Sequence, residues 1–476
     1  MCYSVLRAMA RCFVANLRRR CQKPKYIWHI TQFCVTLRIN AGMNVLIVNT
    51  SEKTGGAAIA ASRLMHALTD NGVKVKMLVR DRQTQNMYVN AVSGVLRHKA
   101  RFVWERFVIF ARNRFSKKHL WDVDIANVGT DITGLPEFEW ADVIHLHWVN
   151  QSFLSWSDIE KIVQSGKKVV WTLHDEWPFT GICHYTDGCD RYQSHCEDCQ
   201  FLRGNTSKDI SYFLFERKKA LYQGINRVTF VGCSNWICER ARTSALLKGR
   251  TTESQINGCI SPCRVVHIPN TIDQTVFCPM DRSEARRKHG LPLDKKLLLF
   301  SSLKVTDKRK GIDYLVEACR QLHCTKPDLD DKIGIVVVGK NTQAIEGLFP
   351  YKLYGIDYVK DEALMAALYG AVDAFVTPSL QDNLPNTIVE AMSVGTPCVA
   401  FAVGGIPEMI HHKEDGYLAT PPSHGLLADD SLDLATGIVY VLDNANNKRL
   451  SEASAHFAAK TYNHSRIASL YADVYR

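Results

Sequence analysis

The fold of this chain is decided by a stretch near its C-terminus, which reads Ser379-Leu-Gln-Asp-Asn-Leu-Pro-Asn-Thr-Ile-Val-Glu-Ala-Met-Ser-Val-Gly-Thr-Pro-Cys-Val-Ala400. An apolar helical run begins at about Pro385, and a Gly-Thr-Pro turn leads into a buried strand. A helix beginning there directs its free backbone N–H groups and the positive end of its dipole at an anion. Asp382 and Glu390 lie on either side of the proline, where carboxylates can hold hydroxyl groups. The stretch predicts an α/β unit that binds a phosphate-linked sugar, although the spacing alone also fits an α/β unit with solvated acids.

The rest of the chain repeats this α/β pattern. Short β-branched runs alternate with helical periods, which is typical of parallel sheets with crossover helices. Nine strands are predicted, at 44–49, 74–79, 142–147, 168–173, 228–232, 296–300, 333–338, 374–377 and 397–401. A proline-containing break at about 262–295 divides them into two groups. We expect an α/β protein of two facing, doubly wound Rossmann-like domains, with ligands in the cleft between them.

The length of the chain also favours two domains. A chain of 476 residues exceeds what one hydrophobic core normally supports. The predicted organisation is a basic extension over 1–42, an N-terminal domain over 43–290, a C-terminal domain over 291–430, and C-terminal helices over 431–476 that pack back on the first domain.

The net charge of +11 is concentrated in the N-terminal extension. Residues 1–42 carry eight Arg or Lys and no acid, so the remainder has a charge of only +3. A nearly neutral body does not indicate a nucleic-acid partner. The extension lacks the order of a secretory signal, and we expect Met43 to be the natural start. A membrane-surface anchor and an organelle-targeting peptide are the alternatives. A cytoplasmic protein is expected.

A second basic segment, 96–120, has an amphipathic pattern. Val103, Phe107 and Phe110 form one helical stripe, while Arg97 and Arg112 lie elsewhere on the helix. Such a helix suits an anionic membrane surface, which would make the protein peripheral at the inner face of the plasma membrane. The alternative is a helix whose stripe packs on the domain core.

Sixteen cysteines are present, four of them in the extension. Reduced thiols are expected in a cytosol. The insertion at 183–199, called here the Cys-rich insertion, places four thiols close together in sequence: Cys183, Cys189, Cys196 and Cys199. Such a set suits a tetrahedral structural zinc site. Free or redox-active thiols and disulfides remain alternatives, because the spacing is not that of a standard zinc finger.

Two loops of the first half follow predicted strands and are expected to face the cleft. The first contains Gly55, Gly56 and Ala57, whose small size lets the backbone approach a ligand at a helix start. The second contains His174, whose ring nitrogen is expected to bind a sugar hydroxyl. His145 and His147 end a neighbouring strand and are possible substitutes.

A basic loop follows the first strand of the second half. It reads Lys304-Val-Thr-Asp-Lys-Arg-Lys-Gly311. Fixed cations stabilise the negative charge that develops on a departing phosphate. Lys310 is predicted to act there together with a second cation, for which Lys304, Lys308 and Arg309 are the candidates.

These motifs resemble those of retaining glycosyltransferases, family 4 in particular. Matches run in order over about 43–420, and the acidic stretch corresponds to the family's E-x7-E signature. Two departures are evident, because Asp382 stands where the family has Glu and Ser302 stands at the expected Arg position. The resemblance implies the two-Rossmann GT-B architecture.

The resemblance also implies roles for single residues. Glu390 would hold the donor ribose, and Asp382 would hold sugar hydroxyls together with the backbone of Asn383 and Leu384. Gly339 would close its strand beside the nucleotide. His174 would contact the donor sugar, while Lys310 and a neighbouring cation, with Arg309 among the candidates, would stabilise the diphosphate.

The predicted activity is therefore sugar transfer from a UDP- or GDP-linked donor. The acceptor is expected to be a saccharide or lipid-linked saccharide in cell-surface polysaccharide synthesis. No cofactor or metal is expected in catalysis, and Asp122-Val-Asp124 is discounted as a metal motif because it lacks the required strand context. A non-catalytic nucleotide-sugar binding or scaffold protein, a phosphorylase and an epimerase are the alternatives.

Overall fold

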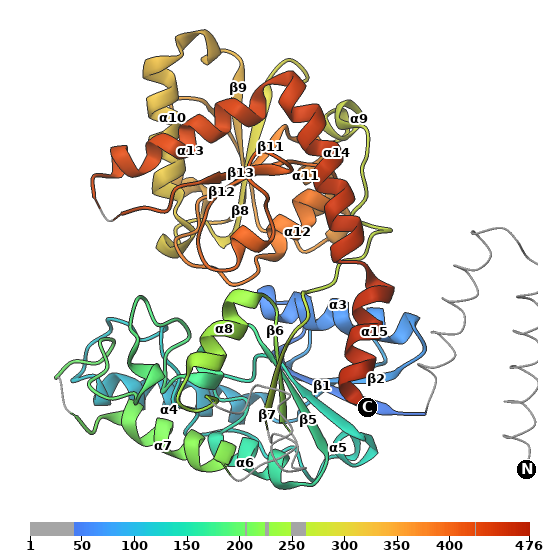
Figure 1. The fold of residues 1–476 in the computed structure, drawn as a ribbon, viewed down its shortest axis with the longest axis vertical. Coiled ribbons are helices and arrows are strands. Elements are labelled where there is room, and N and C mark those ends of the chain that lie inside the picture. Colours follow the sequence, from blue (N-terminus) through green and yellow to red (C-terminus); the bar gives the residue numbers. More distant parts are fainter. Residues whose placement is uncertain (1–41, 205–206, 224–227, 249–262, 424) are drawn as a thin grey trace, which may run out of the picture.

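The computed structural model describes residues 42–476 apart from 205–206, 224–227, 249–262 and 424. The predictions for the N-terminal extension lie outside these residues. The described chain forms two α/β domains, one above the other in Figure 1.

The N-terminal domain is built on a seven-stranded parallel sheet. Its strand order is β3-β2-β1-β4-β5-β6-β7. The strands are β1 (Asn44–Ser51), β2 (Lys74–Asp81), β3 (Val89–Ala91), β4 (Val143–Leu146), β5 (Lys168–Leu173), β6 (Val228–Gly232) and β7 (Cys263–His267). The helices are α3 (Gly56–Asp70), α4 (Val95–Arg112), α5 (Pro136–Trp140), α6 (Trp156–Gln164), α7 (Ile210–Gln223) and α8 (Asn235–Thr243).

The C-terminal domain is built on a six-stranded parallel sheet. Its order is β10-β9-β8-β11-β12-β13. The strands are β8 (Lys296–Lys304), β9 (Ile333–Lys340), β10 (Lys352–Ile356), β11 (Ala374–Thr377), β12 (Cys398–Phe401) and β13 (Gly416–Ala419). The helices are α9 (Arg282–His289), α10 (Ile312–Thr325), α11 (Glu362–Ala371), α12 (Asn386–Ser393), α13 (Leu427–Leu442) and α14 (Asn444–Thr461), and α15 (His464–Tyr475) follows them.

The predicted fold class is confirmed, and the strands that the sequence missed share one property. All nine predicted strands are present, whereas β3, β7, β10 and β13 were not predicted. These four are the edge strands of the two sheets. Each is three to five residues long and pairs with a neighbouring strand on one side only. One of them, β7, lies within the predicted break at 262–295.

The C-terminal helices divide between the two domains. Helices α13 and α14 pack on α10 and α12 of the C-terminal domain. Only α15 crosses to the N-terminal domain, where it lies beside α3 in Figure 1. There the Tyr475 hydroxyl hydrogen-bonds His145 Nδ1 at 2.8 Å, and the Tyr471 hydroxyl bonds the Thr172 hydroxyl at 3.1 Å. The prediction that the helices over 431–476 pack back on the first domain therefore holds for α15 and is wrong for α13 and α14.

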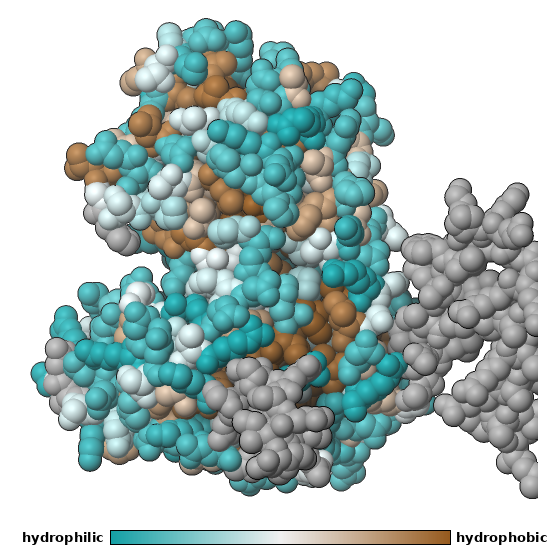
Figure 2. Space-filling model, viewed as in Figure 1, coloured by the Kyte–Doolittle hydropathy of each residue, from teal (hydrophilic) through white to brown (hydrophobic). Residues whose placement is uncertain are grey.

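The carboxyl ends of the central strands face each other across the interdomain space. Figure 2 shows the surface hollowed between the two lobes. In the described residues, no helix is both long enough and apolar enough to cross a bilayer.

Candidate active site between the domains

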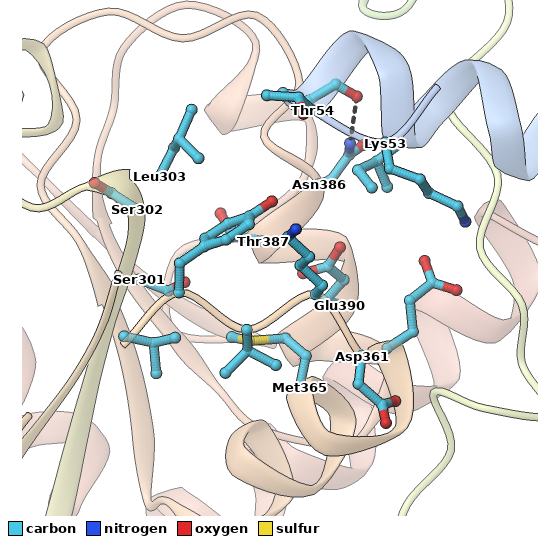
Figure 3. A pocket seen from close by; sticks show the side chains of 18 of the residues that line it. Lys53, Thr54, Ser301, Ser302, Leu303, Asp361, Met365, Asn386, Thr387 and Glu390 are labelled. Carbon is cyan, nitrogen blue, oxygen red and sulfur yellow. Dashed lines mark hydrogen bonds between the residues drawn. The ribbon is translucent and has the colours of Figure 1, made fainter. Parts of the chain in front are cut away.

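Two adjoining cavities occupy the cleft. The first is named the Glu390 cavity and the second the Asp382 cavity, after the acids that line them. Their volumes are about 430 and 500 Å³, within the range of about 300–1,000 Å³ found for small-molecule sites. Both domains contribute, and Figure 3 shows Lys53 and Thr54 from the N-terminal domain opposite Thr387 and Glu390 of α12.

Two helices present their N-termini to the wall that the cavities share. Helix α3 begins after Gly55, whose φ of 92° is left-handed, and α12 begins after Pro385. Neither N-terminus is capped by a side chain. The Asn386 side-chain amide donates to the Gly56 carbonyl at 2.9 Å and so joins the two helix starts. Free N–H groups and two positive dipole ends therefore converge on one place, an arrangement that favours an anion.

Two cations stand beside this wall on a 3₁₀ turn over Lys308–Lys310. Lys310 Nζ lies 2.5 Å from an Asp382 carboxylate oxygen, and Arg309 Nη1 lies 3.8 Å from the same oxygen. Burial by itself would raise the pKa of Asp382, but the two cations outweigh it and hold that pKa below its usual value. Gly311 permits the turn, because its φ is 70° and a Cβ there would lie 1.9 Å from the Pro378 carbonyl oxygen.

The geometry selects the second cation among the three candidates. Arg309 lines the Asp382 cavity, whereas Lys304 and Lys308 are exposed. The Arg309 guanidinium lies over the Tyr185 ring at 5.3 Å from its centroid and donates to the Gln381 carbonyl at 2.8 Å. These contacts fix the group beside Lys310, so the pair Arg309 and Lys310 supplies the positive charge of the Asp382 cavity.

Glu390 is held by an arginine of the other domain. Arg63, on α3, places one terminal nitrogen 2.8 Å from Glu390 and 2.8 Å from Glu362. The Tyr369 hydroxyl donates to Glu390 at 3.0 Å. Burial raises the pKa of Glu390, and Arg63 and Tyr369 oppose that rise only in part. The other terminal nitrogen of Arg63 is buried with no hydrogen-bond partner among the described residues.

Sequence comparisons identify the C-terminal part of this site. Residues 294–444 match the family model described as glycosyl transferases group 1. The chain is 25% identical over 368 residues to the putative colanic acid biosynthesis glycosyl transferase WcaC of Escherichia coli, a match that covers 75% of this chain and 83% of that protein.

Residues 294–444 are therefore a glycosyl transferases group 1 domain.

Other relatives support this assignment over shorter regions. A D-inositol 3-phosphate glycosyltransferase of Stackebrandtia nassauensis is 27% identical over 240 residues, which cover 47% of this chain and 52% of that enzyme.

Solved structures show the same two-domain GT-B fold. Sucrose-phosphate synthase of Thermosynechococcus elongatus superposes with a TM-score of 0.59 at 19% identity, over 91% of this glycosyltransferase and 98% of that chain. The Anabaena protein HepE, solved with UDP and glucose, superposes with a TM-score of 0.54 at 16% identity, over 91% and 99% of the two chains. At these identities the likeness concerns the fold.

The histidine of the glycosyltransferase cleft is less free than the sequence predicted. His174 lines the Asp382 cavity, but its Nε2 lies 2.9 Å from His147 Nδ1 and its Nδ1 lies 3.8 Å from Cys233 Sγ. Burial lowers the pKa of His174 to about 4, so the ring is neutral near pH 7. A sugar hydroxyl can bind a ring nitrogen only by displacing one of these contacts. His145 is buried between Thr172 and Tyr475 and does not line the cavity.

The predicted backbone contacts of the acidic motif are also partly occupied. Leu384 lines the Asp382 cavity. The Asn383 backbone N–H bonds the carboxylate of Asp382, and its side-chain amide donates to the Leu173 carbonyl at 3.0 Å. The Ser234 hydroxyl donates to the Asn383 side-chain oxygen at 2.6 Å. Asn383 therefore joins the two domains at the floor of the cleft.

Gly339 lies behind the cavity wall and does not line either cavity. A Cβ at this position would lie 2.1 Å from the Ser302 carbonyl oxygen, and the φ of 150° is one that other residues rarely adopt. The glycine is therefore required for the close approach of β9 to β8, and its neighbour Val338 is the residue that reaches the Glu390 cavity.

The four thiols of the Cys-rich insertion line one small cavity. In the described part of the chain, no three His, Cys, Asp or Glu side chains are arranged to hold a metal ion. This arrangement does not fit a preformed zinc centre, and the zinc site stays a prediction. Burial raises the pKa of Cys196 and of Cys199 to about 12, so both are neutral thiols here.

Several residues of the site were not predicted from sequence. Trp148 donates its indole N–H to Asp175 at 2.9 Å, and His184 contacts the same carboxylate at 2.7 Å. Tyr185, also from the Cys-rich insertion, reaches the Asp382 cavity beside Arg309. Asp175 could have been predicted from the sequence, because it directly follows His174 at the end of a predicted strand. The others come from separate loops, and only the tertiary structure brings them together.

Proposed function

We propose that this glycosyltransferase transfers a sugar from a nucleoside diphosphate sugar to a saccharide or lipid-linked saccharide, with retention of configuration. One observation carries the proposal: two uncapped helix N-termini lie at the wall shared by two cavities, and two cations line the Asp382 cavity beside it. A diphosphate is the ligand that uses all four groups, because it is a compact dianion with several acceptor oxygens.

The two cavities suggest how the donor is divided. We place the nucleoside in the Glu390 cavity, where the ribose hydroxyls meet Glu390 and the base lies near the backbone of Tyr358 and Val359. The transferred sugar then lies in the Asp382 cavity. Arg309 and Lys310 would stabilise the negative charge that grows on the leaving diphosphate.

The bound ribose would share the Glu390 carboxylate with Arg63. Arg63 donates to this carboxylate at 2.8 Å in the structure, and a carboxylate has room for further donors. We propose that Glu390 accepts hydrogen bonds from the ribose while Arg63 keeps its contact with Glu362.

The retaining course rests on the family resemblance, and no nucleophile is assigned. Retention would follow if the acceptor attacks from the side that the diphosphate leaves, through an oxocarbenium-like transition state. Neutral His174 and the carboxylate of Asp382 line the reacting end of the cavity. Asn383 joins the two domains at this end, and closure of the domains there would limit donor hydrolysis by water.

The donor base and the pathway are proposed from the relatives. HepE was solved with UDP-glucose, which supports a uridine donor, and a GDP-sugar is the second choice. The name of WcaC refers to colanic acid biosynthesis, which supports a role in cell-surface polysaccharide synthesis. We propose a cytoplasmic protein working at the inner face of the plasma membrane.

A thermal-shift panel of UDP- and GDP-sugars tests the donor proposal. A ligand that binds only the native state raises the melting temperature. We expect one sugar nucleotide to do so, Glu390→Gln to abolish that shift, and Glu452→Gln, an exposed acid on α14, to preserve it. Donor hydrolysis is then measured with the same sugar nucleotide.

Two results would oppose the proposal. No shift with any sugar nucleotide would remove the donor site. A shift without hydrolysis or transfer to any acceptor would support a non-catalytic binding protein instead. Once an acceptor is found, the anomeric configuration of the product, measured by NMR, decides between retention and inversion.

A further inference from the structure

Helix α4 (Val95–Arg112) exposes its apolar stripe to solvent. The exposed fractions are 82% for Leu96, 65% for Val103, 53% for Trp104 and 51% for Phe107. These positions lie seven, eight and eleven residues after the first and therefore share one face of the helix. An apolar face of this kind normally packs on a core or a partner.

The opposite face of α4 attaches the helix to its domain through Ile109, which is buried in the core, and through polar contacts. Arg106 Nη2 lies 3.1 Å from Glu105 and 3.1 Å from Asp124, and all three side chains are buried. The prediction that the stripe packs on the domain core is therefore wrong for Val103 and Phe107. The third residue of that stripe, Phe110, is half-buried.

The ionisable side chains that α4 and the following turn expose are all basic. They are Arg97, Lys99, Arg112, Arg114, Lys117 and Lys118. The one acid of this segment, Glu105, is buried with Arg106. An apolar stripe between exposed cations is the pattern of a helix that lies in the headgroup region of an anionic bilayer.

We propose that the exposed face of α4 docks this glycosyltransferase on an anionic phospholipid bilayer, with Trp104 and Phe107 in the headgroup–acyl boundary. The charge of the face decides between a bilayer and a second copy of the chain. In a twofold-symmetric dimer through this face, the basic flanks of the two copies would meet one another. A bilayer rich in anionic lipid instead supplies the opposite charge along the whole helix.

The docked helix is connected to the cleft through one buried carboxylate. Asp124 accepts from Arg106 of α4 and from the Gln151 backbone N–H at 2.8 Å. Gln151 lines the Asp382 cavity. Docking through α4 would therefore hold the N-terminal wall of the cleft in a fixed relation to the bilayer, as a lipid-linked acceptor requires. The docking itself is independent of the proposed donor.

Vesicle co-sedimentation of the full chain tests the proposal. The probes are vesicles of phosphatidylcholine alone and vesicles with about a third phosphatidylglycerol. We expect binding to the anionic vesicles only. Trp104→Ser/Phe107→Ser should weaken it about tenfold or more, because two aromatic anchors leave the boundary. Arg97→Ser/Arg112→Ser should weaken binding to the anionic vesicles by about fivefold for each charge removed. This loss should be smaller at high salt, because salt screens the charges.

Matched controls come from the C-terminal domain. Leu432→Ser removes a residue that is 60% exposed on α13, and Lys448→Ser/Arg449→Ser removes two exposed charges on α14. Both should bind vesicles like the parent protein. All variants should keep the parent melting temperature, because the substituted side chains are exposed.

Three outcomes would overturn the proposal. The first is no binding to anionic vesicles by the parent chain. The second is equal loss in the α4 variants and the controls. The third is a dimer, detected by light scattering at the concentration used, that only the Trp104→Ser/Phe107→Ser variant dissociates, because the face would then belong to a second copy.

Discussion

The C-terminal wall of the cleft takes its charged groups from two short motifs, whereas the N-terminal wall collects its polar groups from several separate loops. Arg309 and Lys310 are adjacent in sequence, and Asp382 and Glu390 belong to one loop and helix. On the other side, Trp148, Asp175 and Tyr185 follow different strands or belong to the Cys-rich insertion. The comparison teaches that the C-terminal wall is compact in sequence, while the N-terminal wall is dispersed and can vary loop by loop.

Arg63 couples the two walls through a buried ion pair. Its guanidinium is buried between Glu362 and Glu390 and lies 5.0 Å from the centre of the Phe277 ring. Arg63→Ala would leave a buried carboxylate without its cation. We expect the free energy of unfolding to fall by about 3–5 kcal/mol, measured by urea unfolding.

The double variant Arg63→Ala/Glu390→Gln is the control for the Arg63 prediction. It removes the stranded charge as well as the cation and should recover part of the lost stability. A loss below about 1 kcal/mol in the single variant would show that the pair behaves like an exposed one, and the strong coupling of the two walls would be wrong.

Lys310 tests the charge of the C-terminal wall. We expect Lys310→Ala to lower the turnover number about 10²–10³-fold, because a fixed donor to the leaving group is removed. The measurement is donor hydrolysis or transfer at saturating donor. Lys308→Ala, on the same turn but exposed, should retain activity. An equal loss of turnover in the two variants would show that the overall positive charge of the turn, and not the position of Lys310, supports catalysis.

Tyr185 tests whether the N-terminal wall assists the other wall. Its ring supports Arg309 at 5.3 Å, so Tyr185→Leu should lower turnover by about 3- to 30-fold, the range of a cation–π contact. The effect should stay below that of Lys310→Ala, because Arg309 keeps its bond to the Gln381 carbonyl. Tyr88→Leu, at a tyrosine 46% exposed in the same domain, should leave turnover unchanged. Unchanged turnover in Tyr185→Leu would show that the N-terminal wall does not assist Arg309 through this ring.

The smallest expected effect concerns the buried histidines of the N-terminal wall. Burial lowers the pKa of His145 to about 3 and of His174 to about 4, from an ordinary value of 6.5. The unfolded chain therefore binds more protons than the folded one below pH 6.5, and stability falls as pH drops from 6.5 towards 4. At pH 6 the loss should be less than about 1 kcal/mol for each histidine.

Urea unfolding at pH 7.5, 6 and 5 in one buffer series, at about constant ionic strength, measures this dependence. His145→Gln should flatten it, since the variant has one group fewer to protonate. His456→Gln, at an exposed histidine on α14, is the matched control. Stability that does not change between pH 7.5 and 5 would contradict the neutral, buried state of these rings.

Much of the C-terminal domain could be predicted because its signals are local. The apolar runs of β8, β9, β11 and β12 mark strands that are covered on both faces. The pattern around Pro385 marks a helix start, and Lys310-Gly311 marks a left-handed turn that glycine permits. Each of these features is specified within a few residues, so the sequence by itself determined the fold class, the central strands and the acidic and basic motifs of the cleft.

Only the tertiary structure decided which groups meet. Arg63 reaches Glu390 across more than three hundred positions of sequence, and His174 loses both ring nitrogens to His147 and Cys233. The choice of Arg309 as the second cation depends on a ring from the Cys-rich insertion. The direction of the α4 stripe was equally open, because periodicity fixes which residues share a face but not what that face contacts. Pairings between distant loops depend on how the chain packs as a whole, and no local pattern records them.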